Sequence, residues 1–458
     1  MSTTPPVLDR RRAGVLLHAG SLPSGRLDDA ARFLRFLADA GFSAWQLLPV
    51  GPSGAGRSPY SPLSAFAGDP GLIPKSQRAE PVSREALGRF VEREQSWLRD
   101  YALFMTIRGA LGGLPWWQWP APLRDRDPAA VRRIEHRYAE PLVEAMRMQL
   151  RFERAWRAVR AQAVAAGIRL FGDLPMFVMA DSADAWAQRE WFRLDARGSP
   201  THLAGVPPDA FTEDGQCWNC PVYDWPAMQQ DGFSWWQRRL AHELRRFDLL
   251  RWDHFRGLIA GWEIPAPEGG TAPQAARGAW RPVPGRALLT SLADRYRPLP
   301  VVAENLGIIT PEVECLRRDF GLPGMHVLQF AFDGSADNPH LPVHHEEQGV
   351  AYSGTHDNDT TVGWSSGLID GTRRRAAETL DLAPARLPEA MLGAVLESKS
   401  RLAVLTMQDL LGLGSAARLN TPGQAQGQWR WRFAWSQLTP DLPRQWRQAI
   451  VCSNRQPA

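Results

Sequence analysis

The chain has 458 residues, of which 44% are hydrophobic and 22% charged, and its formal net charge is +4. This composition is typical of a soluble globular protein and argues against a disordered or fibrous chain. The cations are nearly all arginine and lie scattered among acids, so no basic block predicts a nucleic-acid partner. No apolar run approaches the length of a membrane span or of a secretion signal, so we expect no membrane partner and a cytoplasmic location.

Four cysteines are too few for a disulfide framework in a chain of this length. Cys217 and Cys220 form a C-x-x-C pair, but no second pair accompanies them, and zinc is not expected. We predict reduced thiols, no metal and no organic cofactor. Tryptophan is frequent, with 20 residues against 6 tyrosines. These rings fit both core packing and stacking against sugars, and composition alone does not separate the two uses.

The N-terminal part reads as a strand, a helix and a second strand. Residues 12–18 form a short apolar run, residues 27–40 carry apolar side chains at helical spacing up to Gly41, and residues 42–49 are again apolar. This order predicts the opening of a β-α-β unit.

Two long stretches interrupt the pattern. Residues 71–165 read mainly as helices, and residues 174–232 read as a loop-rich insertion, with an apolar strand near 167–173 between them. A third stretch, 264–284, is rich in Pro, Gly and Ala and reads as a surface loop. We expect all of them to belong to a single catalytic domain that spans residues 1–458.

Further short apolar runs occupy residues 249–253, 300–304, 325–330, 349–354 and 402–406. Helical segments fall in most of the gaps, for example at 234–247, 286–296 and 311–320. Eight strands alternating with helices predict an α/β fold, a (β/α)8 TIM-type barrel with insertions after strands 2, 3 and 4. No run of strands follows residue 406, so a C-terminal β domain is not expected.

Acidic residues fall at the ends of several predicted strands. Asp173 ends the third strand, Asp253 the fourth and Glu304 the fifth, and Asp357 follows the seventh. In a barrel these ends meet at one mouth, where catalytic groups gather. A single acid at such a place is usually a helix cap, but four on one rim are harder to explain in that way.

The surroundings of two acids suggest different protonation states. Arg251 and Asp253 stand two residues apart on a strand and project to the same face. A guanidinium beside a carboxylate keeps it ionised, as a nucleophile requires, although a buried structural ion pair is the alternative. Glu304 follows the apolar run 301–303, which suits a carboxyl group that holds its proton. Two carboxyl groups facing one bond allow glycoside cleavage, with retention when they are roughly 5–5.5 Å apart.

A series of motifs then follows the chain in order. They are Leu16-Leu-His18 with Ser21-Leu-Pro-Ser24, Trp45-Gln-Leu-Leu-Pro49, Ser58-Pro-Tyr-Ser-Pro-Leu-Ser-Ala-Phe-Ala-Gly68, Gly172-Asp-Leu-Pro-Met-Phe-Val178 with Asp181-Ser-Ala-Asp184, Ala204-Gly-Val-Pro-Pro-Asp209, Arg251-Trp-Asp-His-Phe-Arg-Gly257, Ala303-Glu-Asn-Leu-Gly307, Gly354-Thr-His-Asp-Asn-Asp-Thr360 and Arg418-Leu-Asn-Thr-Pro-Gly423. Together they resemble the amylomaltases (4-alpha-glucanotransferases), and more distantly the alpha-amylase clan. The resemblance covers about residues 12–433.

The resemblance implies roles for particular residues. Asp253 would be the nucleophile, Glu304 the general acid/base, and Asp357 the third acid, which holds ring hydroxyls of the reacting glucose. Arg251 would orient Asp253, while His356 and Tyr60 would contact the same glucose. Further residues match positions around the glucan-binding groove: Asp173, Asp209, Gln216, Trp218, His254 and Asn420.

The implied activity is a retaining transfer of alpha-1,4-glucan segments between maltooligosaccharides by double displacement, without a metal or other cofactor. A hydrolase of the same clan is the alternative, since it differs only in letting water attack the intermediate. A non-catalytic glucan-binding protein is disfavoured, because all three acids are present. The sequence does not distinguish a monomer from a homodimer.

The chain departs from the family pattern at three positions. Asn305 stands where the family usually has Asp, and a neutral neighbour should slightly lower the pKa of Glu304 if the two are close. The family's Gly-Gln-x-Trp-Gly-Asn-Pro reads Gly-Gln-Cys-Trp-Asn-Cys-Pro over residues 215–221. Asn219 therefore replaces a Gly and Cys220 an amide, so we expect the loop shape and hydrogen bonds there to differ.

Overall fold

Eight parallel strands form a barrel in this computed structural model, which describes residues 5–54, 56–208, 213–267, 272–381, 386–424 and 426–457. The strand order is β10-β11-β12-β1-β2-β3-β6-β9. The strands are β1 (Arg12–Leu16), β2 (Ala44–Gln46), β3 (Arg169–Leu174), β6 (Leu249–Trp252), β9 (Val301–Ala303), β10 (Gly324–Val327), β11 (Gly349–Tyr352) and β12 (Leu402–Thr406). They coincide with the eight predicted strands, so the (β/α)8 barrel is confirmed.

The two end strands of this order, β9 and β10, meet through backbone and side chain together. The N–H of Ala303 donates to the Pro323 carbonyl (2.8 Å), and the N–H of Met325 donates to Asn305 Oδ1 (2.8 Å). Asn305 Nδ2 in turn donates to Glu314 Oε1 (2.7 Å). The side-chain amide of Asn305 therefore acts as acceptor and donor at once, at the junction of β9 and β10 that closes the barrel, which we call the barrel seam.

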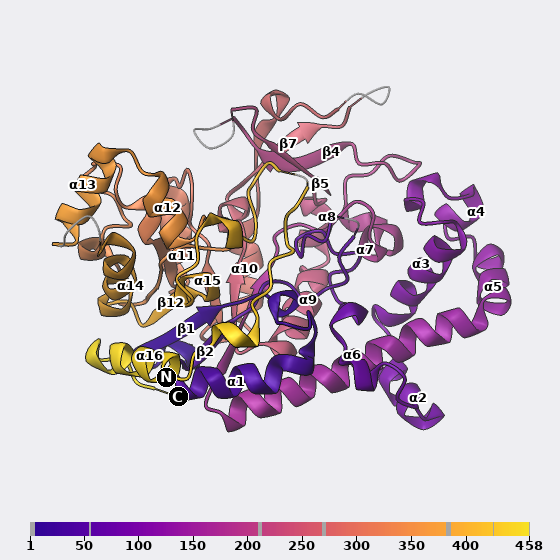
Figure 1. Cartoon of the computed structure of the whole chain (residues 1–458). Coiled ribbons are helices and arrows are strands. Elements are labelled where there is room, and N and C mark those ends of the chain that lie inside the picture. Colours follow the sequence, from indigo (N-terminus) through magenta and orange to yellow (C-terminus); the bar gives the residue numbers. More distant parts are fainter. Residues whose placement is uncertain are drawn as a thin grey trace.

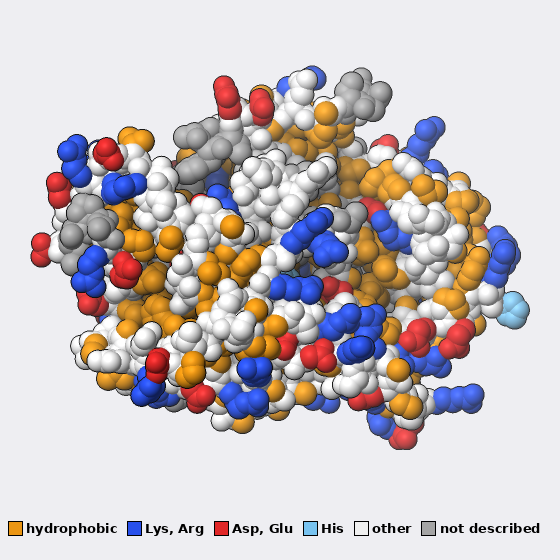
Figure 2. Space-filling view, viewed as in Figure 1, with side chains coloured by type: hydrophobic (Ala, Val, Ile, Leu, Met, Phe, Trp, Pro, Cys, Tyr) orange, Lys and Arg blue, Asp and Glu red, His pale blue; other side chains and the backbone are white. Residues whose placement is uncertain are grey.

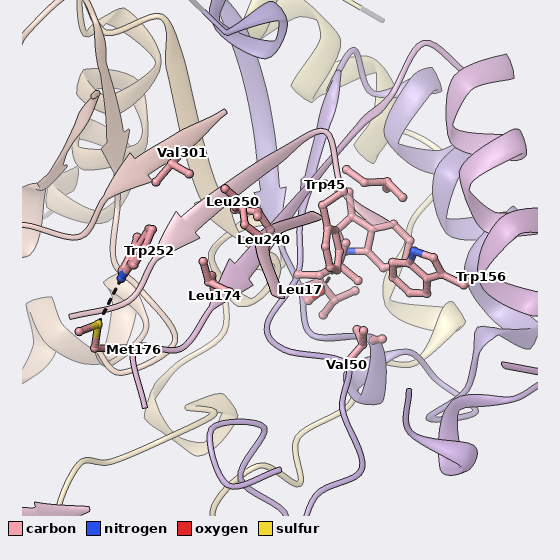
Figure 3. Packing of buried hydrophobic residues seen from close by; sticks show 14 of the residues in the cluster. Leu17, Trp45, Val50, Trp156, Leu174, Met176, Leu240, Leu250, Trp252 and Val301 are labelled. Atoms are coloured by element: carbon pink, nitrogen blue, oxygen red, sulfur yellow. Dashed lines mark hydrogen bonds between the residues drawn. The ribbon is translucent and has the colours of Figure 1, made fainter. Parts of the chain in front are cut away.

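Alternation along the strands separates an inner core from an outer one. The inner cluster contains Leu249 and Val302, whereas their neighbours Leu250 and Val301 belong to the larger cluster between strands and helices. Figure 3 shows part of that outer layer, where the Trp252 indole donates to Met176 Sδ (3.4 Å). Because side chains alternate, residues 251 and 253 continue the inward row that begins at Leu249.

Helices surround the barrel. Those following its strands are α1 (Ala30–Asp39), α9 (Ser234–Arg246), α10 (Gly285–Ala293), α11 (Pro311–Asp319), α12 (Thr361–Gly367), α13 (Asp370–Thr379), α14 (Leu387–Glu397), α15 (Met407–Leu410) and α16 (Leu442–Cys452). Residues 71–165 carry α2 (Arg84–Arg93), α3 (Leu98–Ala110), α4 (Ala121–Arg124), α5 (Pro128–Arg137) and α6 (Ala139–Ala165). In Figure 1, α3, α4 and α5 stand to the right of the barrel, and the two ends of the chain lie together at the lower left.

A second, antiparallel sheet was not predicted. It has the order β5-β4-β7-β8, with β4 (His202–Val206), β5 (Gln216–Pro221), β7 (Ala260–Pro265) and β8 (Ala279–Pro282), and it lies above the barrel in Figure 1. The short helices α7 (Ala183–Ala187) and α8 (Trp225–Gln230) belong to the same region. The prediction of a surface loop over 264–284 was wrong where β7 ends and β8 runs. Gly and Pro within these strands concealed them, since both residues are depleted in strands.

Candidate active site

The acids at the strand ends meet at one mouth of the barrel. Asp173 and Arg251 are register partners on β3 and β6, and Arg251 pairs with Val302 on β9, two residues before Glu304. Two of the acids follow an inward-facing core residue by two positions: Asp173 follows Phe171, and Glu304 follows Val302. The period of two therefore turns both of these carboxyl groups toward the barrel axis.

Arg251 stands at the centre of the site. Its Nη1 lies 2.7 Å from Asp173 Oδ2, and its Nη2 lies 2.8 Å from Asp253 Oδ1. Burial opposes the guanidinium charge, but Asp173, Tyr60, Asp253 and Glu304 together hold the pKa of Arg251 above its ordinary value. Arg251 is thus a fixed cation that two carboxylates share.

The distances around Arg251 also limit the separation of Asp253 and Glu304. Arg251 Nη2 lies 2.8 Å from Asp253 Oδ1 and 4.0 Å from Glu304 Oε2, so these oxygens are at most the sum of the two distances, 6.8 Å, apart. Carboxyl groups of retaining glycosidases are about 5–5.5 Å apart, and those of inverting enzymes about 6.5–9.5 Å. The upper limit of 6.8 Å therefore excludes most of the separations found in inverting enzymes.

Glu304 is a carboxyl group that burial keeps protonated. Its Oε2 accepts from the N–H of His254 (2.6 Å) and its Oε1 from the N–H of Leu306 (3.0 Å). Burial raises the pKa of Glu304 to about 8, with the charge of Asp253 adding to the rise, while Arg251 and the two N–H groups pull it down. At neutral pH most molecules therefore carry a proton on Glu304.

The backbone around residue 254 is bent to serve this contact. His254 has left-handed dihedral angles (φ 52°, ψ 51°), which a non-glycine residue rarely adopts. This turn directs its N–H to Glu304, and its imidazole packs edge-on to Trp218 with ring centroids 4.8 Å apart. Burial lowers the pKa of His254 to about 4, so the ring is neutral at pH 7.

Beside Arg251 lie the half-buried Tyr60 and the buried Asp173. The Tyr60 hydroxyl donates to Asp173 Oδ2 (2.8 Å), and the Tyr60 ring stacks on His356 with centroids 5.1 Å apart. Burial raises the pKa of Asp173 to about 7 against the opposing charge of Arg251. Burial also lowers the pKa of His356, so a neutral imidazole faces the tyrosine ring.

Asp357 is the most open of the four acids, with its side chain 43% exposed. Asn420 Nδ2 donates to Asp357 Oδ1 (2.6 Å), and His356 Nε2 lies 3.4 Å from Asp357 Oδ2. Both carboxylate oxygens are thus oriented by neighbours while the group stays accessible. Arg418 Nη2 donates to the Asp357 carbonyl (2.6 Å), a contact that was not predicted.

Two more predicted residues lie on β5. Trp218 Nε1 donates to Gln216 Oε1 (3.1 Å), and Trp218 also packs against Phe177 with centroids 6.0 Å apart. Asp209 lies outside the described residues. Trp429 was missed by sequence reasoning, although its ring packs 6.0 Å from Tyr60 and 5.8 Å from His356 by centroids. Its segment has neither strand nor helix periodicity, so no sequence signal pointed to it.

The structure accommodates the unusual residues of β5. Asn219 has φ 56°, a left-handed conformation that Gly adopts freely and Asn tolerates better than most residues. Cys220 is buried, its Sγ lies 3.4 Å from the Trp218 carbonyl, and burial raises its thiol pKa to about 12. Cys217, Cys220, Cys315 and Cys452 are all free thiols.

Comparison with known proteins agrees with the geometry. The sequence profile of the family described as 4-alpha-glucanotransferase (Glyco_hydro_77) matches residues 16–79 and 74–438. The chain belongs to this family. A 4-alpha-glucanotransferase of Thermus thermophilus is 44% identical over 94% of this chain and 96% of its own. One from Synechocystis is 40% identical over 94% of this chain and 95% of its own.

Solved structures of the 4-alpha-glucanotransferase family share the fold. An amylomaltase from Streptococcus agalactiae, solved in complex with acarbose, superposes with a TM-score of 0.93 at 29% identity, covering 98% of this chain and 100% of that one. An amylomaltase from Corynebacterium glutamicum has a TM-score of 0.79 at 18% identity, covering 99% of this chain and 77% of that one, and shares the fold.

Among the described residues, no helix is long and apolar enough to cross a membrane. Within the same residues, no group of three or more His, Cys, Asp or Glu side chains is placed to hold a metal ion. On the face shown in Figure 2, basic and acidic side chains are interspersed.

Proposed function

We propose that this chain is a retaining 4-alpha-glucanotransferase in which Asp253 is the nucleophile and Glu304 the general acid/base. The proposal rests on the unequal distances from Arg251 to the two carboxyl groups: its Nη2 lies 2.8 Å from Asp253 Oδ1 but 4.0 Å from Glu304 Oε2. Asp253 is in direct contact with the cation, and Glu304 keeps its proton through burial. Retaining glycosidases need this combination.

The reaction proceeds in two displacements. A carboxylate oxygen of Asp253 attacks the anomeric carbon of an alpha-1,4-linked glucose, and Glu304 gives its proton to the departing O4 of the next sugar. The bond between the anomeric carbon and that oxygen breaks as the covalent glycosyl-enzyme forms. Glu304, now ionised, takes the proton from the 4-hydroxyl of an acceptor glucan. That oxygen attacks the anomeric carbon, Asp253 is released, and the configuration is retained.

The surrounding residues position the glucan. Asp357, oriented by Asn420 and His356, would accept hydrogen bonds from hydroxyl groups of the reacting glucose. Tyr60 would pack against the same ring, held in place by Asp173. Aromatic and polar groups of this kind suit a sugar, which offers apolar ring faces and hydroxyls.

The outer wall of the groove would come from the insertion 174–232. Gln216, Trp218 and Asp209 belong to it, and His254 packs against Trp218 from the barrel side. The whole chain, residues 1–458, would act as one catalytic domain on maltooligosaccharides and longer alpha-1,4-glucans. We further propose a cytoplasmic location, where the four free thiols would stay reduced.

Incubation with pure maltotriose tests the function. A transferase produces glucose together with a ladder of longer maltooligosaccharides, whereas a hydrolase produces shorter sugars alone. Hydrolysis is not favoured by the named relatives, which are glucanotransferases. Asp253→Asn should abolish the ladder while maltotriose still binds, and the exposed Asp294→Asn should leave it intact. Full activity of Asp253→Asn would refute the assignment of the nucleophile.

A further inference from the structure

Arg256 connects three parts of the structure that meet beside the two catalytic loops. It lies in the 3-10 turn Phe255–Leu258, directly after Asp253 and His254. Its Nη1 donates to the carbonyl of Ile308, four residues beyond Glu304. Its guanidinium carbon lies 3.7 Å from the ring centroid of Trp280 on β8. One side chain thus spans the loop after β6, the loop after β9 and the antiparallel sheet.

The loop that Arg256 reaches is held by side-chain packing at its two ends and not by backbone hydrogen bonds of its own. Gly307 has φ 83° and Ile308 is 63% exposed, whereas the flanking Leu306 and Ile309 pack against the inner and outer hydrophobic clusters. In the described part of the chain, no backbone–backbone hydrogen bond is made by residues 306–309. The N–H of Leu306 instead donates to Glu304 Oε1 (3.0 Å). A displacement of Leu306 would therefore change a hydrogen bond to the acid/base carboxyl group.

Trp280 holds Arg256 in place. A guanidinium over an indole face is a favourable cation–π contact. Trp280 is also register partner of Trp262 on β7, and their rings meet edge-on with centroids 5.1 Å apart. The sheet that carries this pair is the same one that carries Trp218 on β5, so sheet and acid/base loop are mechanically joined.

We propose that Arg256 is a positioning residue for the transfer reaction: clamped on Trp280, it holds the Ile308 carbonyl and thereby keeps the Leu306 N–H on Glu304. The inference rests on the proposed function of Glu304 and adds a residue to it. Among the described residues, Arg256 makes no hydrogen bond or ion pair with Asp253 or Glu304, so it acts through the loop.

The proposal predicts a change in pH dependence that a purely structural role would not produce. The charged groups facing Glu304 are Arg251 and Asp253, and substitution at 256 leaves both in place. The Leu306 N–H favours the ionised form of Glu304, so its loss raises the pKa of that carboxyl. If substitution of Arg256 removes this hydrogen bond, the pH at which kcat/KM falls on the alkaline side should therefore be higher than in the wild type.

Four variants separate the contributions. Arg256→Ala should lower kcat/KM for maltotriose about ten- to a hundredfold and move the alkaline limb upward, because it loses the clamp. Arg256→Lys should restore most of the activity, since a single donor reaches Ile308. Trp280→Ala should shift the limb in the same direction while the cation at 256 remains, which separates positioning from charge. Arg32→Ala removes an arginine stacked 4.1 Å from Trp435 elsewhere and should change neither quantity.

The outcomes are distinguishable from failure of the proposed function. Arg256→Ala with wild-type kcat/KM and an unmoved alkaline limb, in a protein with unchanged thermal unfolding, overturns the role of Arg256. If Arg256→Ala unfolds, the Lys and Trp280→Ala variants still carry the test, and an unmoved limb in Trp280→Ala counts against it. A wild-type chain that makes no ladder from maltotriose would instead contradict the function itself.

Discussion

Arg251 Nη2 lies 2.8 Å from Asp253 Oδ1, close enough for a charge-assisted hydrogen bond. The same nitrogen is 4.0 Å from Glu304 Oε2, beyond hydrogen-bond distance. The cation therefore contacts one carboxyl group directly, while burial favours the protonated form of the other. The consequences can be measured in rate and in stability.

The rate should fall on the alkaline side because Glu304 must carry a proton to donate one. Burial raises its pKa to about 8, so kcat/KM for maltotriose should fall as pH rises through about 8. A pH series of initial rates measures this limb. Glu304→Gln with maltosyl fluoride, whose leaving group needs no proton, should form the glycosyl-enzyme without an alkaline limb. A limb that persists there would assign it to another group.

The same raised pKa should cost stability at high pH. A carboxyl group with a folded-state pKa above its ordinary 4.5 favours folding below that value, and the contribution is lost as pH rises toward about 8. Glu304→Gln removes the titration, so its Tm relative to wild type should rise between pH 5 and pH 9. Exposed Glu378→Gln is the matched control, with a Tm difference that stays flat. A flat difference for Glu304→Gln as well would contradict the buried pKa.

Tyr60→Phe tests the hydroxyl apart from the ring. The change keeps the stack on His356 but removes the donor to Asp173 Oδ2, and Asp173 Oδ1 already lacks a partner among the described residues. We expect a loss of about 1–2 kcal/mol in the free energy of unfolding, measured by urea titration. Tyr60→Ala should in addition raise KM, because it removes the ring. Equal KM values for the two variants would argue against sugar stacking.

Asn420 should matter through the orientation and charge of Asp357. Its Nδ2 donates to Asp357 Oδ1 at 2.6 Å. Asn420→Ala removes one donor, and we expect a roughly tenfold fall in kcat/KM. Asn420→Asp is nearly the same size but sets a second carboxylate against Asp357, so it should fall further at pH 8 and recover toward Asn420→Ala as pH is lowered. Identical pH profiles would show that the residue contributes packing alone.

The sequence could predict the barrel because its strands are short apolar runs separated by helical periodicity. The inward positions of Arg251 and Asp253 followed from the same alternation, and the barrel topology then brought Glu304 beside them. What it could not predict were contacts made by irregular segments. The position of Trp429, the contact of Arg256 with Trp280 and the antiparallel strands β4, β5, β7 and β8 depend on tertiary packing, which no local period records.

Asn305 illustrates how a single departure from a family pattern acquires a reason in the structure. The sequence-based prediction concerned the effect of its neutral side chain on the pKa of Glu304. In the structure, the side chain of Asn305 instead forms hydrogen bonds at the barrel seam. Oδ1 of Asn305 accepts from the N–H of Met325, and its Nδ2 donates to Glu314 Oε1. The other oxygen of Glu314, Oε2, accepts from Arg317. An amide satisfies both neighbours, and an aspartate cannot donate.

Asn305→Asp should therefore destabilise the protein in a pH-dependent way. Two carboxylates would meet where Asn305 Nδ2 and Glu314 Oε1 are now 2.7 Å apart, so one of them must take up a proton or the seam must open. We expect a fall in Tm at pH 8 that shrinks as pH is lowered. Thermal unfolding monitored by circular dichroism measures it.

A substitution at Glu314 tests the same hydrogen bond from the acceptor side. Glu314→Gln alone leaves one acceptor oxygen for two donors, Asn305 Nδ2 and the Arg317 guanidinium, and removes the charge that pairs with Arg317, so it should lower Tm by itself. Combined with Asn305→Asp it restores one donor facing one acceptor, with the amide now on α11. The double variant should therefore be more stable than the sum of the single losses predicts, because the two residues share one interaction. Additive losses would show that the seam does not depend on the hydrogen bond between residues 305 and 314.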